Sequence, residues 1–594
     1  MTWSVKARLR ELAAAETGPP PKEPGGRLTV ALIWPGDYRT SLSALGYLSI
    51  YGWLNARPEI LAERFFWPEG DLAAAYRRSG APLLSLESGR PLRDFDLVAA
   101  SLALENDYWR LPALLTAGGL AAVGSERSED DPPVLAGGVA VWANPWPVWP
   151  FVDLVLAGEA EAQWPHLLSA WDAIKFSPLP KIDRLRFLAR NTPGSLHPGA
   201  GAGPPLSPGR SSRCFYPVAT PGPEPGVSPA RLAWPPAGLL PPVAPIVSPQ
   251  AEFAGVKLVE IGRGCPHGCR FCLTGAIFRP SRHWPSAAVL QALGPPAAAG
   301  EKVGLVSPAA AEHPDLAELL AALFRQNRTV TLSSLSLTAV TPALAEKLAA
   351  GRLYGAAVAP EAGSQVLRDR LNKALTEEQI LAGVRLLSAA GLQKIKLYFM
   401  LGLPGETEAD LAALVDLVRR IRGEARPFLT LSLANFTPKP HTPLEESAMN
   451  TAAEFRRKGR LVSRALKGLP RLQVNLDPPL WSIAQGLLAR GGVESGRLVA
   501  ALWRHQGRLK PSLAEFGYTP GHPLHRPWPE GGPKPWRIVR PAAGLDWLAD
   551  EAERARRGLA CPPCPLESNC GRCAACDQDS SERRTKNENH CRGL

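Results

Sequence analysis

From residue 256 onward the sequence alternates six times between strand-like apolar runs and amphipathic helical stretches. Strands that alternate with helices form parallel sheets, and six consecutive units predict an open, partial (β/α)6 barrel. In such barrels the chemistry takes place at the carboxyl ends of the strands. We place this domain at 251–450. The expected strands lie at 256–262, 302–308, 329–336, 354–361, 394–402 and 428–436.

A second alternation of strands and helices runs from 28 to 175 and predicts a doubly wound, Rossmann-like domain. Ligands of such domains bind beyond the carboxyl ends of the strands. A glycine at a strand end lets a ligand approach the backbone or makes a tight turn, and the residues alone leave both interpretations open. The candidate positions at these strand ends are Asp37, Ser101, Gly137, Gly138 and Gly158.

The rest of the chain divides by composition. Residues 1–27 form an amino-terminal extension. Residues 176–250 are expected to be a linker, because 14 of the 50 residues from 201 to 250 are proline. Residues 451–560 have mainly helical patterns, and 561–594 form a cysteine-rich tail. The predicted fold class is therefore α/β, with a mainly helical carboxy-terminal region.

Composition excludes some classes of protein. No apolar run is long enough to span a bilayer, and the amino terminus carries charges where a secretion signal would need an apolar core. We therefore expect a cytoplasmic protein without a membrane partner. The net charge of +12 allows nucleic acid as a partner, but the cations are scattered, which favours an ordinary solvated surface.

Three cysteines, Cys265, Cys269 and Cys272, form a C-x3-C-x2-C pattern directly after the first strand of the predicted barrel. Three thiolates can hold three irons of a [4Fe–4S] cube and leave the fourth iron open. The alternative is a zinc site that uses a further ligand, for which His267 and His283 are candidates. The position at the barrel mouth favours the cluster, since a catalytic metal needs an open coordination position.

This loop and its place in the barrel resemble the radical S-adenosylmethionine (radical SAM) enzymes. The resemblance implies that Cys265, Cys269 and Cys272 bind the cube, that SAM binds its fourth iron, and that reductive cleavage of SAM yields a 5′-deoxyadenosyl radical. It also implies a flavodoxin- or ferredoxin-type electron donor.

Other barrel motifs extend the resemblance to the SAM site. Phe271 matches the aromatic position that packs on the SAM adenine, and Glu361 in "APEAGSQ" matches a polar residue on the ribose. The second strand ends in "VSPAAAE" where the family often has a Gly-Gly-Glu-like segment, so backbone near Ser307 is expected to meet the SAM amino group. The remaining implied SAM contacts are Ser364, Gly402, Leu403, Pro404 and Gly405.

The first domain resembles the cobalamin-binding domain of a branch of this family whose nearest members lack an assigned substrate. Cobalamin-binding domains often supply a histidine to cobalt, but the matching stretch "GDYRTSLSALG" holds Asp37 and Arg39 and no histidine. The resemblance thus implies cobalamin without that bond, near Asp37, Ser101, Gly137, Gly138 and Gly158. The alternative is a domain that keeps the fold without the ligand.

The tail carries a second cysteine cluster, with C-x2-C-x5-C-x2-C-x2-C spacing from Cys561 to Cys576. Repeated C-x2-C pairs predict a metal site, either zinc or an auxiliary iron–sulfur cluster. The spacing favours an auxiliary [4Fe–4S] cluster, with Cys561 as the spare thiol. Unliganded thiols are the remaining alternative. The expected ligands are Cys564, Cys570, Cys573 and Cys576.

The sequence therefore predicts a radical SAM enzyme, with cobalamin-dependent methyl transfer or radical rearrangement as its reaction. One alternative is a cobalamin-independent radical SAM enzyme that modifies RNA. Another is a non-catalytic iron–sulfur protein with a binding or regulatory role, although an intact cysteine triad argues against it. The substrate, small molecule or macromolecule, is not indicated by the residues.

Overall fold

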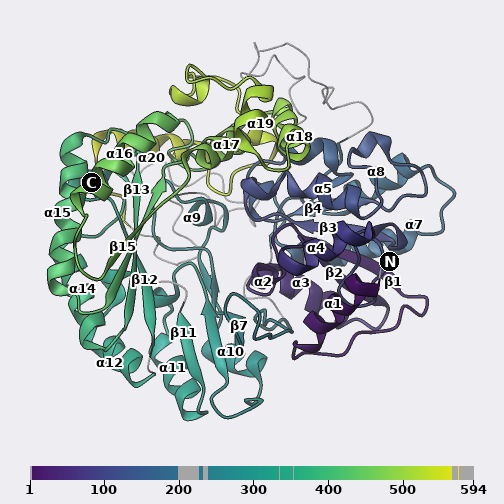
Figure 1. Cartoon of the computed structure of the whole chain (residues 1–594), viewed down its shortest axis with the longest axis horizontal. Coiled ribbons are helices and arrows are strands. Elements are labelled where there is room, and N and C mark those ends of the chain that lie inside the picture. Colours follow the sequence, from purple (N-terminus) through teal and green to yellow (C-terminus); the bar gives the residue numbers. More distant parts are fainter. Residues whose placement is uncertain are drawn as a thin grey trace, which may run out of the picture.

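The computed structural model describes residues 3–198, 227–231, 238–332, 335–351, 353–562, 564 and 573. Figure 1 shows the amino-terminal domain on the right, the barrel on the left, and the carboxy-terminal helices α17–α19 across the top between them. Within the described residues, none of the helices has both the length and the apolar character needed to cross a membrane.

The amino-terminal domain is built on a sheet in the order β2-β1-β3-β4-β5-β6. The first five strands are parallel, and β6 pairs antiparallel with β5. The strands are β1 (Leu28–Trp34), β2 (Ile60–Phe66), β3 (Leu97–Ser101), β4 (Val134–Gly137), β5 (Leu154–Leu156) and β6 (Ser195–Leu196). Helices cover both faces, as the doubly wound prediction requires. They are α2 (Tyr38–Ser41), α3 (Leu45–Asn55), α4 (Gly70–Ser79), α5 (Arg110–Ala117), α6 (Val139–Ala143), α7 (Ala160–Ile174) and α8 (Lys181–Asn191), with 3-10 turns η1 (Leu92–Asp94), η2 (Glu105–Asp107), η3 (Gly124–Glu126) and η4 (Trp146–Phe151).

This domain differs from the sequence-based boundaries at both ends. Helix α8 and strand β6 lie in the expected linker, because the prolines that suggested a linker begin only near 204. At the other end, α1 (Trp3–Ala14) covers the domain with Val5, Leu9 and Leu12, which are buried in its core.

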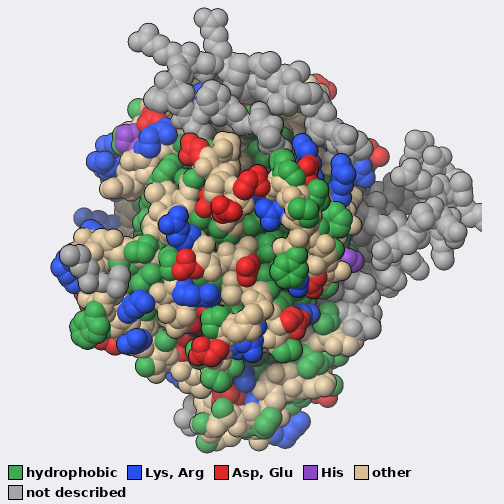
Figure 2. All heavy atoms as spheres, turned by 90° about the vertical axis from the view of Figure 1, so that its right-hand side faces the viewer, with side chains coloured by type: hydrophobic (Ala, Val, Ile, Leu, Met, Phe, Trp, Pro, Cys, Tyr) green, Lys and Arg blue, Asp and Glu red, His purple; other side chains and the backbone are tan. Residues whose placement is uncertain are grey.

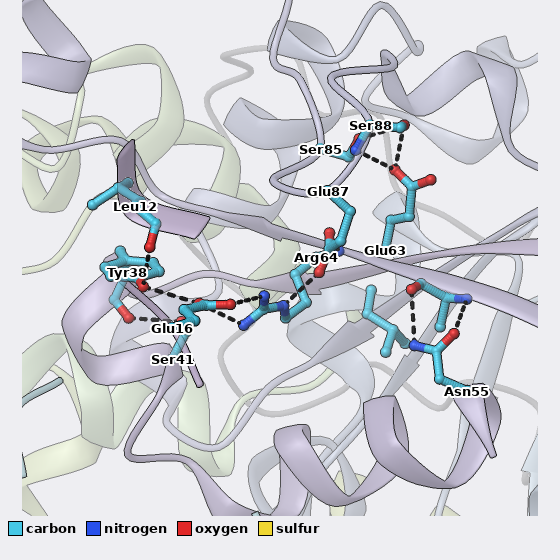
Figure 3. Close-up of polar contacts among 12 residues, drawn as sticks. Leu12, Glu16, Tyr38, Ser41, Asn55, Glu63, Arg64, Ser85, Glu87 and Ser88 are labelled. Atoms are coloured by element: carbon cyan, nitrogen blue, oxygen red, sulfur yellow. Dashed lines mark hydrogen bonds and ion pairs between the residues drawn. The ribbon is translucent and has the colours of Figure 1, made fainter. Parts of the chain in front are cut away.

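A buried arginine fixes the amino-terminal extension to the sheet (Figure 3). Arg64 on β2 lies 2.6 Å from Glu16 and 2.6 Å from Glu87, and all three side chains are at most 6% exposed. The Tyr38 hydroxyl donates to Glu16 at 2.9 Å. Burial alone would lower the pKa of Arg64, but the charges of Glu87 and Glu16 outweigh it and raise that pKa.

The barrel is a row of parallel strands in two hydrogen-bonded groups, β11-β10-β7 and β12-β13-β14-β15. The Leu335 amide donates to the Ala357 carbonyl at 2.9 Å and joins the two groups. The strands are β7 (Val256–Glu260), β10 (Lys302–Val306), β11 (Thr329–Leu332), β12 (Gly355–Glu361), β13 (Lys394–Leu401), β14 (Phe428–Asn435) and β15 (Leu472–Leu476). The prediction of a partial barrel is confirmed, and β15 extends it by one parallel strand that the sequence pattern did not reveal.

Helices follow the barrel strands as the amphipathic pattern predicts. Three of them begin with a capping box. In each, the hydroxyl of the N-cap threonine accepts from the backbone amide of the third helical residue, and the side chain of that third residue accepts from the backbone amide of the threonine. The N-cap residues are Thr376, Thr407 and Thr451. The helices are α9 (Leu273–Ile277), α10 (Ser286–Leu293), α11 (Leu316–Arg325), α12 (Pro342–Ala350), α13 (Gln365–Arg370), α14 (Glu377–Ala389), α15 (Glu408–Glu424) and α16 (Ala452–Ala465), with 3-10 turns η5 (Ala310–Glu312) and η6 (Leu337–Ala339).

The carboxy-terminal region connects the two domains. The side-chain amide of Asn144, just after α6, donates to three backbone carbonyls at the carboxyl end of α17. They are those of Leu488 and Ala489, in its last turn, and of Gly491, which follows it. The helices here are α17 (Pro479–Arg490), α18 (Gly496–Arg504), α19 (Leu509–Phe516) and α20 (Leu545–Arg557), with 3-10 turns η7 (Val493–Ser495), η8 (Pro523–His525) and η9 (Pro535–Ile538).

Candidate active site

The three cysteines lie in a loop that a short hairpin closes at the barrel mouth. Strand β8 (Gly262–Arg263) pairs antiparallel with β9 (Arg282–His283), and the loop and α9 lie between them. Gly264 has φ +79°, and a Cβ there would lie 2.3 Å from the Phe278 carbonyl oxygen, so the loop folds back closely on itself. The Cys272 amide donates to the Cys269 carbonyl at 3.1 Å. The sequence-predicted triad is therefore brought into one compact turn.

The three thiols are half-buried and share one environment. Burial, and then the charge of Cys269, raise the pKa of Cys265 to about 12, and burial raises the pKa of Cys269 to about 11. Within the described chain, no three or more His, Cys, Asp or Glu side chains are grouped to hold a metal ion.

Lys373 lies beside the thiols and was not predicted from the sequence. Burial lowers its pKa, but the charges of Cys269 and Glu361 outweigh this and raise it. Its Nζ is 3.7 Å from Oε1 of Glu361. Burial raises the pKa of Glu361, opposed by Lys373. A cation is thus held next to three ligands that become anions when they bind metal.

The predicted SAM contacts converge around one apolar cluster. Phe271 packs against buried residues that include Leu403, Leu371 and Phe436. Gly402, which follows β13, has φ +78° and donates from its amide to Glu406 at 3.0 Å. The aromatic residue of the cysteine loop and Leu403 of the "GLPG" turn thus belong to one apolar cluster.

The other members of this set make contacts within the protein. Ser364 caps α13 and donates to Asp410 at 2.5 Å, so it ties two loops together. The Pro404 carbonyl accepts from Arg370 at 3.1 Å, and a Cβ at Gly405 would lie 2.0 Å from that guanidinium. Ser307 is buried, and its hydroxyl accepts from the Ala309 amide.

The two candidate zinc histidines are near the loop but are not grouped with the thiols as ligands of one ion. Nε2 of His267 lies 2.9 Å from Glu312, and this contact lowers the pKa of Glu312. His283 stacks edge-to-face on His313, and burial followed by that neighbour lowers its pKa to about 4. His267 therefore has a hydrogen-bond partner within the barrel, whereas neither ring nitrogen of His283 has one among the described residues.

The strand-end residues of the amino-terminal domain have contacts with the chain's own backbone. Asp37 accepts from the Thr40 amide at 2.8 Å as the cap of α2. Gly138 has φ +110°, and a Cβ there would lie 2.5 Å from the Leu102 carbonyl oxygen. Gly158 has φ +140°, and a Cβ would lie 2.3 Å from the Ala230 carbonyl oxygen. The turn interpretation thus accounts for both glycines without a ligand.

Ser101 and Gly137 are paired neighbours at the ends of β3 and β4. A Cβ at Gly137 would make only an ordinary contact of 3.4 Å. These two positions therefore leave the ligand interpretation open.

The carboxyl ends of the two sheets are turned toward each other. Glu159, after β5, pairs with Arg282 on β9 and lies 3.4 Å from Arg263 on β8. Trp142 and Phe278 are stacked edge-to-face at 5.0 Å. The end of the amino-terminal sheet where ligands would bind is thus joined directly to the cysteine hairpin.

Part of the tail is also at this site. The Cys564 amide donates to the Pro266 carbonyl at 2.9 Å, and the Cys561 amide donates to Asn372 at 2.7 Å. Cys573 is buried, with its Sγ 3.7 Å from Nη1 of Arg279. Cys570 and Cys576, the other predicted tail ligands, lie outside the described residues.

Comparison with known proteins agrees with this arrangement. The family model for the N-terminal region of radical SAM proteins matches residues 46–197, and the model for the radical SAM superfamily matches residues 259–418. The chain is 25% identical over 474 residues to the uncharacterized protein MJ0966 of Methanocaldococcus jannaschii, covering 78% of this chain and 88% of that protein.

Two solved structures are among the similar ones. The radical SAM methyltransferase TsrM from Kitasatospora setae, solved with cobalamin and a [4Fe–4S] cluster, aligns with a TM-score of 0.49 and 16% identity, over 72% of this chain and 78% of that one. The cobalamin-dependent SAM radical enzyme OxsB aligns with a TM-score of 0.43 and 14% identity, over 68% of this chain and 53% of that one.

Proposed function

The chain belongs to the radical SAM superfamily, and we propose that Cys265, Cys269 and Cys272 hold a [4Fe–4S] cluster at which SAM is cleaved reductively. The observation that carries the proposal is the half-buried triad in one hairpin loop at the carboxyl end of the barrel, with Lys373 beside it. When bound, the cluster supplies one electron to SAM at its open iron. An external donor of the flavodoxin or ferredoxin type would deliver that electron.

The residues of the chain bind and orient the cosubstrate. Phe271 and Leu403 offer an apolar surface for the adenine. Glu361 would accept from the ribose hydroxyls, and Lys373, which lies 3.7 Å from Glu361, would supply a positive charge for the carboxylate of SAM or for the cluster thiolates. Backbone near Ser307 is the proposed contact of the amino group. Because these groups are largely buried, water is kept from the reacting atoms.

We further propose that cobalamin binds between the two sheets and that the reaction is methyl transfer or a radical rearrangement on a substrate held there. The support is the doubly wound domain, whose ligand-binding end faces the cysteine hairpin through Glu159 and Arg282. Ser101 and Gly137 are the proposed contacts at that end, together with the turns at Asp37, Gly138 and Gly158. No histidine stands at Arg39, so the lower cobalt face would have another ligand or none.

The tail is proposed to hold a second metal centre on Cys564, Cys570, Cys573 and Cys576, as an auxiliary [4Fe–4S] cluster or zinc. Cys561 is proposed as the spare thiol, as the spacing of the tail cysteines indicates.

The test is anaerobic reconstitution of the full chain with iron and sulfide, followed by reduction in the presence of SAM. We expect 5′-deoxyadenosine from the wild type and none from Cys269→Ala. Iron, cobalt and zinc contents measured on the same samples test the cobalamin and tail proposals. An unchanged yield of 5′-deoxyadenosine from Cys269→Ala would contradict the assignment of the triad.

A second candidate substrate is RNA, and one feature favours it. Five exposed cations follow one stripe of α16 and the segment after it, and none forms an ion pair within the described part of the chain. They are Arg456, Arg460, Arg464, Lys467 and Arg471. By contrast, Figure 2 shows the face of the amino-terminal domain, where Lys/Arg and Asp/Glu side chains are interspersed. A phosphate backbone is the partner that such a stripe suits.

A further inference from the structure

Arg270 stands inside the cluster motif, between Cys269 and Cys272, yet its side chain points into the protein and is 0% exposed. Its Nε donates to Glu551 at 2.9 Å, and its Nη2 donates to the Leu559 carbonyl at 2.6 Å. Its Nη1 donates to the carbonyls of Asp369 and Arg370. A buried guanidinium needs such a set of acceptors. The positions of these acceptors therefore fix the position of the cysteine loop that carries Arg270.

The carboxylate that neutralises Arg270 comes from α20, close to the carboxy terminus. Glu551 is 3% exposed, although most charged residues of α20 are on its solvent side. Contacts with the cluster region recur along α20 at every fourth residue. Trp547 packs under Arg279 at 4.4 Å, Glu551 binds Arg270, and Ala555 lies in the apolar cluster with Phe271. One stripe of α20 thus faces the cysteine loop and the proposed adenine site.

A second bridge lies beyond the end of α20. Asn372 accepts from the Cys561 amide at 2.7 Å and donates to the Gly268 carbonyl at 3.1 Å. The Cys564 amide donates to the Pro266 carbonyl at 2.9 Å. Gly268 and Pro266 both lie between Cys265 and Cys269, so the tail runs alongside the loop.

We propose that α20, residues 559–562 and Cys564 clamp the cluster-binding loop, with Glu551, Arg270 and Asn372 as positioning residues that hold it ready for the cluster. The proposal deepens the proposed function, on which it rests for the identity of the bound group. The contacts that hold the cysteine loop are made by the protein alone, so the clamp can be tested without knowing which group the loop binds. Glu551 acts only through Arg270 and touches no cosubstrate.

The clamp also couples the two cysteine clusters. Cys564, a proposed tail ligand, is bonded to the backbone inside the triad loop. Coupling between two sites is reciprocal, so if a metal in the tail favours cluster binding, the cluster favours that metal by the same factor. Loss of the tail ligands is therefore expected to loosen the triad loop as well.

The experiment compares Glu551→Gln with Glu553→Gln in the full chain. Glu553 is on the same helix and is exposed, and among the described residues it pairs with Arg556 alone, in an i,i+3 contact, so it controls for loss of a charge. In the metal-free proteins, hydrogen exchange of 264–283 should be at least tenfold faster in Glu551→Gln and unchanged in Glu553→Gln. In the reconstituted proteins, a chelator should extract iron at least tenfold faster from Glu551→Gln. Equal exchange and equal extraction in both variants would overturn the clamp.

Asn372→Gly keeps the proposal testable if Glu551→Gln does not fold. Asn372 has φ +52°, a conformation that glycine adopts freely, so this variant removes only the side chain that bridges tail and loop. We expect hydrogen exchange of the loop and extraction of iron each to be at least threefold faster than in the wild type. Glu551→Asp, which keeps the carboxylate, should be less affected than Glu551→Gln. Absence of any change in Asn372→Gly would also count against the clamp.

The two readouts separate this proposal from the proposed function. If the wild type takes up no iron, the radical SAM assignment fails, while the exchange of the metal-free loop still decides on the clamp. If iron is bound and SAM is cleaved but the loop exchanges equally in all variants, the clamp alone is wrong.

Discussion

Two buried arginines, Arg64 and Arg270, each bind a carboxylate from a terminal segment of the chain. Arg64 on β2 holds Glu16 of the amino-terminal extension, and Arg270 in the cysteine loop holds Glu551 of α20. Both side chains are almost fully excluded from water. The physical device is the same: a charge that cannot be left unpaired fixes a distant segment in place.

The surroundings of the two arginines differ. Arg64 has two carboxylates, Glu16 and Glu87, and lies in a regular strand whose backbone is already paired with β1. Arg270 has one carboxylate and several carbonyls, and lies in an irregular loop. Losing the first pair should lower the stability of a domain, whereas losing the second should disorder a loop that has few other constraints. The same contact thus serves stability at one end of the chain and the active site at the other.

The largest expected effect is that of Arg64→Met, which leaves Glu16 and Glu87 buried without their cation. The free energy of unfolding of the amino-terminal domain should fall by about 3–5 kcal/mol. Urea denaturation followed by tryptophan fluorescence measures it. The folded fraction should keep its iron as the wild type does. Faster iron release from folded Arg64→Met would contradict the claim that the Arg64 pair affects only stability and the Arg270 pair the cysteine loop.

Gly138→Ala tests whether the strand ends of the amino-terminal domain are shaped by the protein itself. The new Cβ would lie 2.5 Å from the Leu102 carbonyl oxygen, in a backbone conformation with φ +110°. We expect a loss of about 3 kcal/mol without any cobalamin present. Gly137→Ala, with its nearest contact at 3.4 Å, is the matched control. Equal thermal unfolding of both variants would favour the ligand interpretation instead.

His441 joins the two domains without a buried charge. Its Nδ1 accepts from Arg537 at 3.2 Å, so Nε2 carries the proton and donates to the Ala143 carbonyl at 2.9 Å. Burial, and then the charge of Arg537, lower the pKa of His441 to about 3, from an ordinary value of 6.5. Below pH 6.5 the unfolded chain binds a proton at His441 that the folded chain does not bind. The free energy of unfolding therefore decreases as the pH falls toward 3.

From pH 7 to pH 5 this group should cost the wild type about 2 kcal/mol of unfolding free energy. His441→Asn, which tolerates the positive φ at this position, removes the titrating group. Urea midpoints at the two pH values should therefore differ less in the variant. Parallel pH profiles would show that the junction does not depend on a neutral histidine.

The smallest effect on stability is expected at the exposed cations of α16. Replacing Arg456, Arg460 and Arg464 by glutamine should change the unfolding free energy by less than about 0.5 kcal/mol. If RNA is bound there, affinity for a tRNA transcript should fall, and the slope of log K against log salt should decrease by about 3. Identical salt dependence in wild type and variant would remove the support for the RNA alternative.

The fold and the triad could be predicted because they depend on local patterns. Strand–helix periodicity located all six expected barrel strands, and the spacing of Cys265, Cys269 and Cys272 identified the loop. Strand β15 was missed, although Leu472, Val474 and Leu476 alternate with polar residues, because it is short and lies in a region judged to be mainly helical. Helix α8 was missed because the expected linker was judged from its proline-rich part.

The contacts that organise the site could not be predicted, because they join residues far apart in the sequence. Arg270 and Glu551 are separated by 281 residues, and each alone resembles an ordinary surface charge. Lys373 and Asn372 lie in "RLNKAL", which carries no motif. Only the fold brings them to the cysteine loop. The strand-end glycines show the converse: a pattern that suggests a ligand can be explained by the chain's own backbone.

The most direct test of the central claim is electron paramagnetic resonance of the reduced, reconstituted protein with and without SAM. If the triad holds a cube with one open iron, the wild type should give a [4Fe–4S] signal whose g-values shift when SAM is added. The Cys265/Cys269/Cys272 triple-alanine variant should show no signal that responds to SAM, even if the tail retains a cluster. A wild-type signal that is indifferent to SAM, or a SAM-dependent shift that survives in the triple variant, would contradict the account.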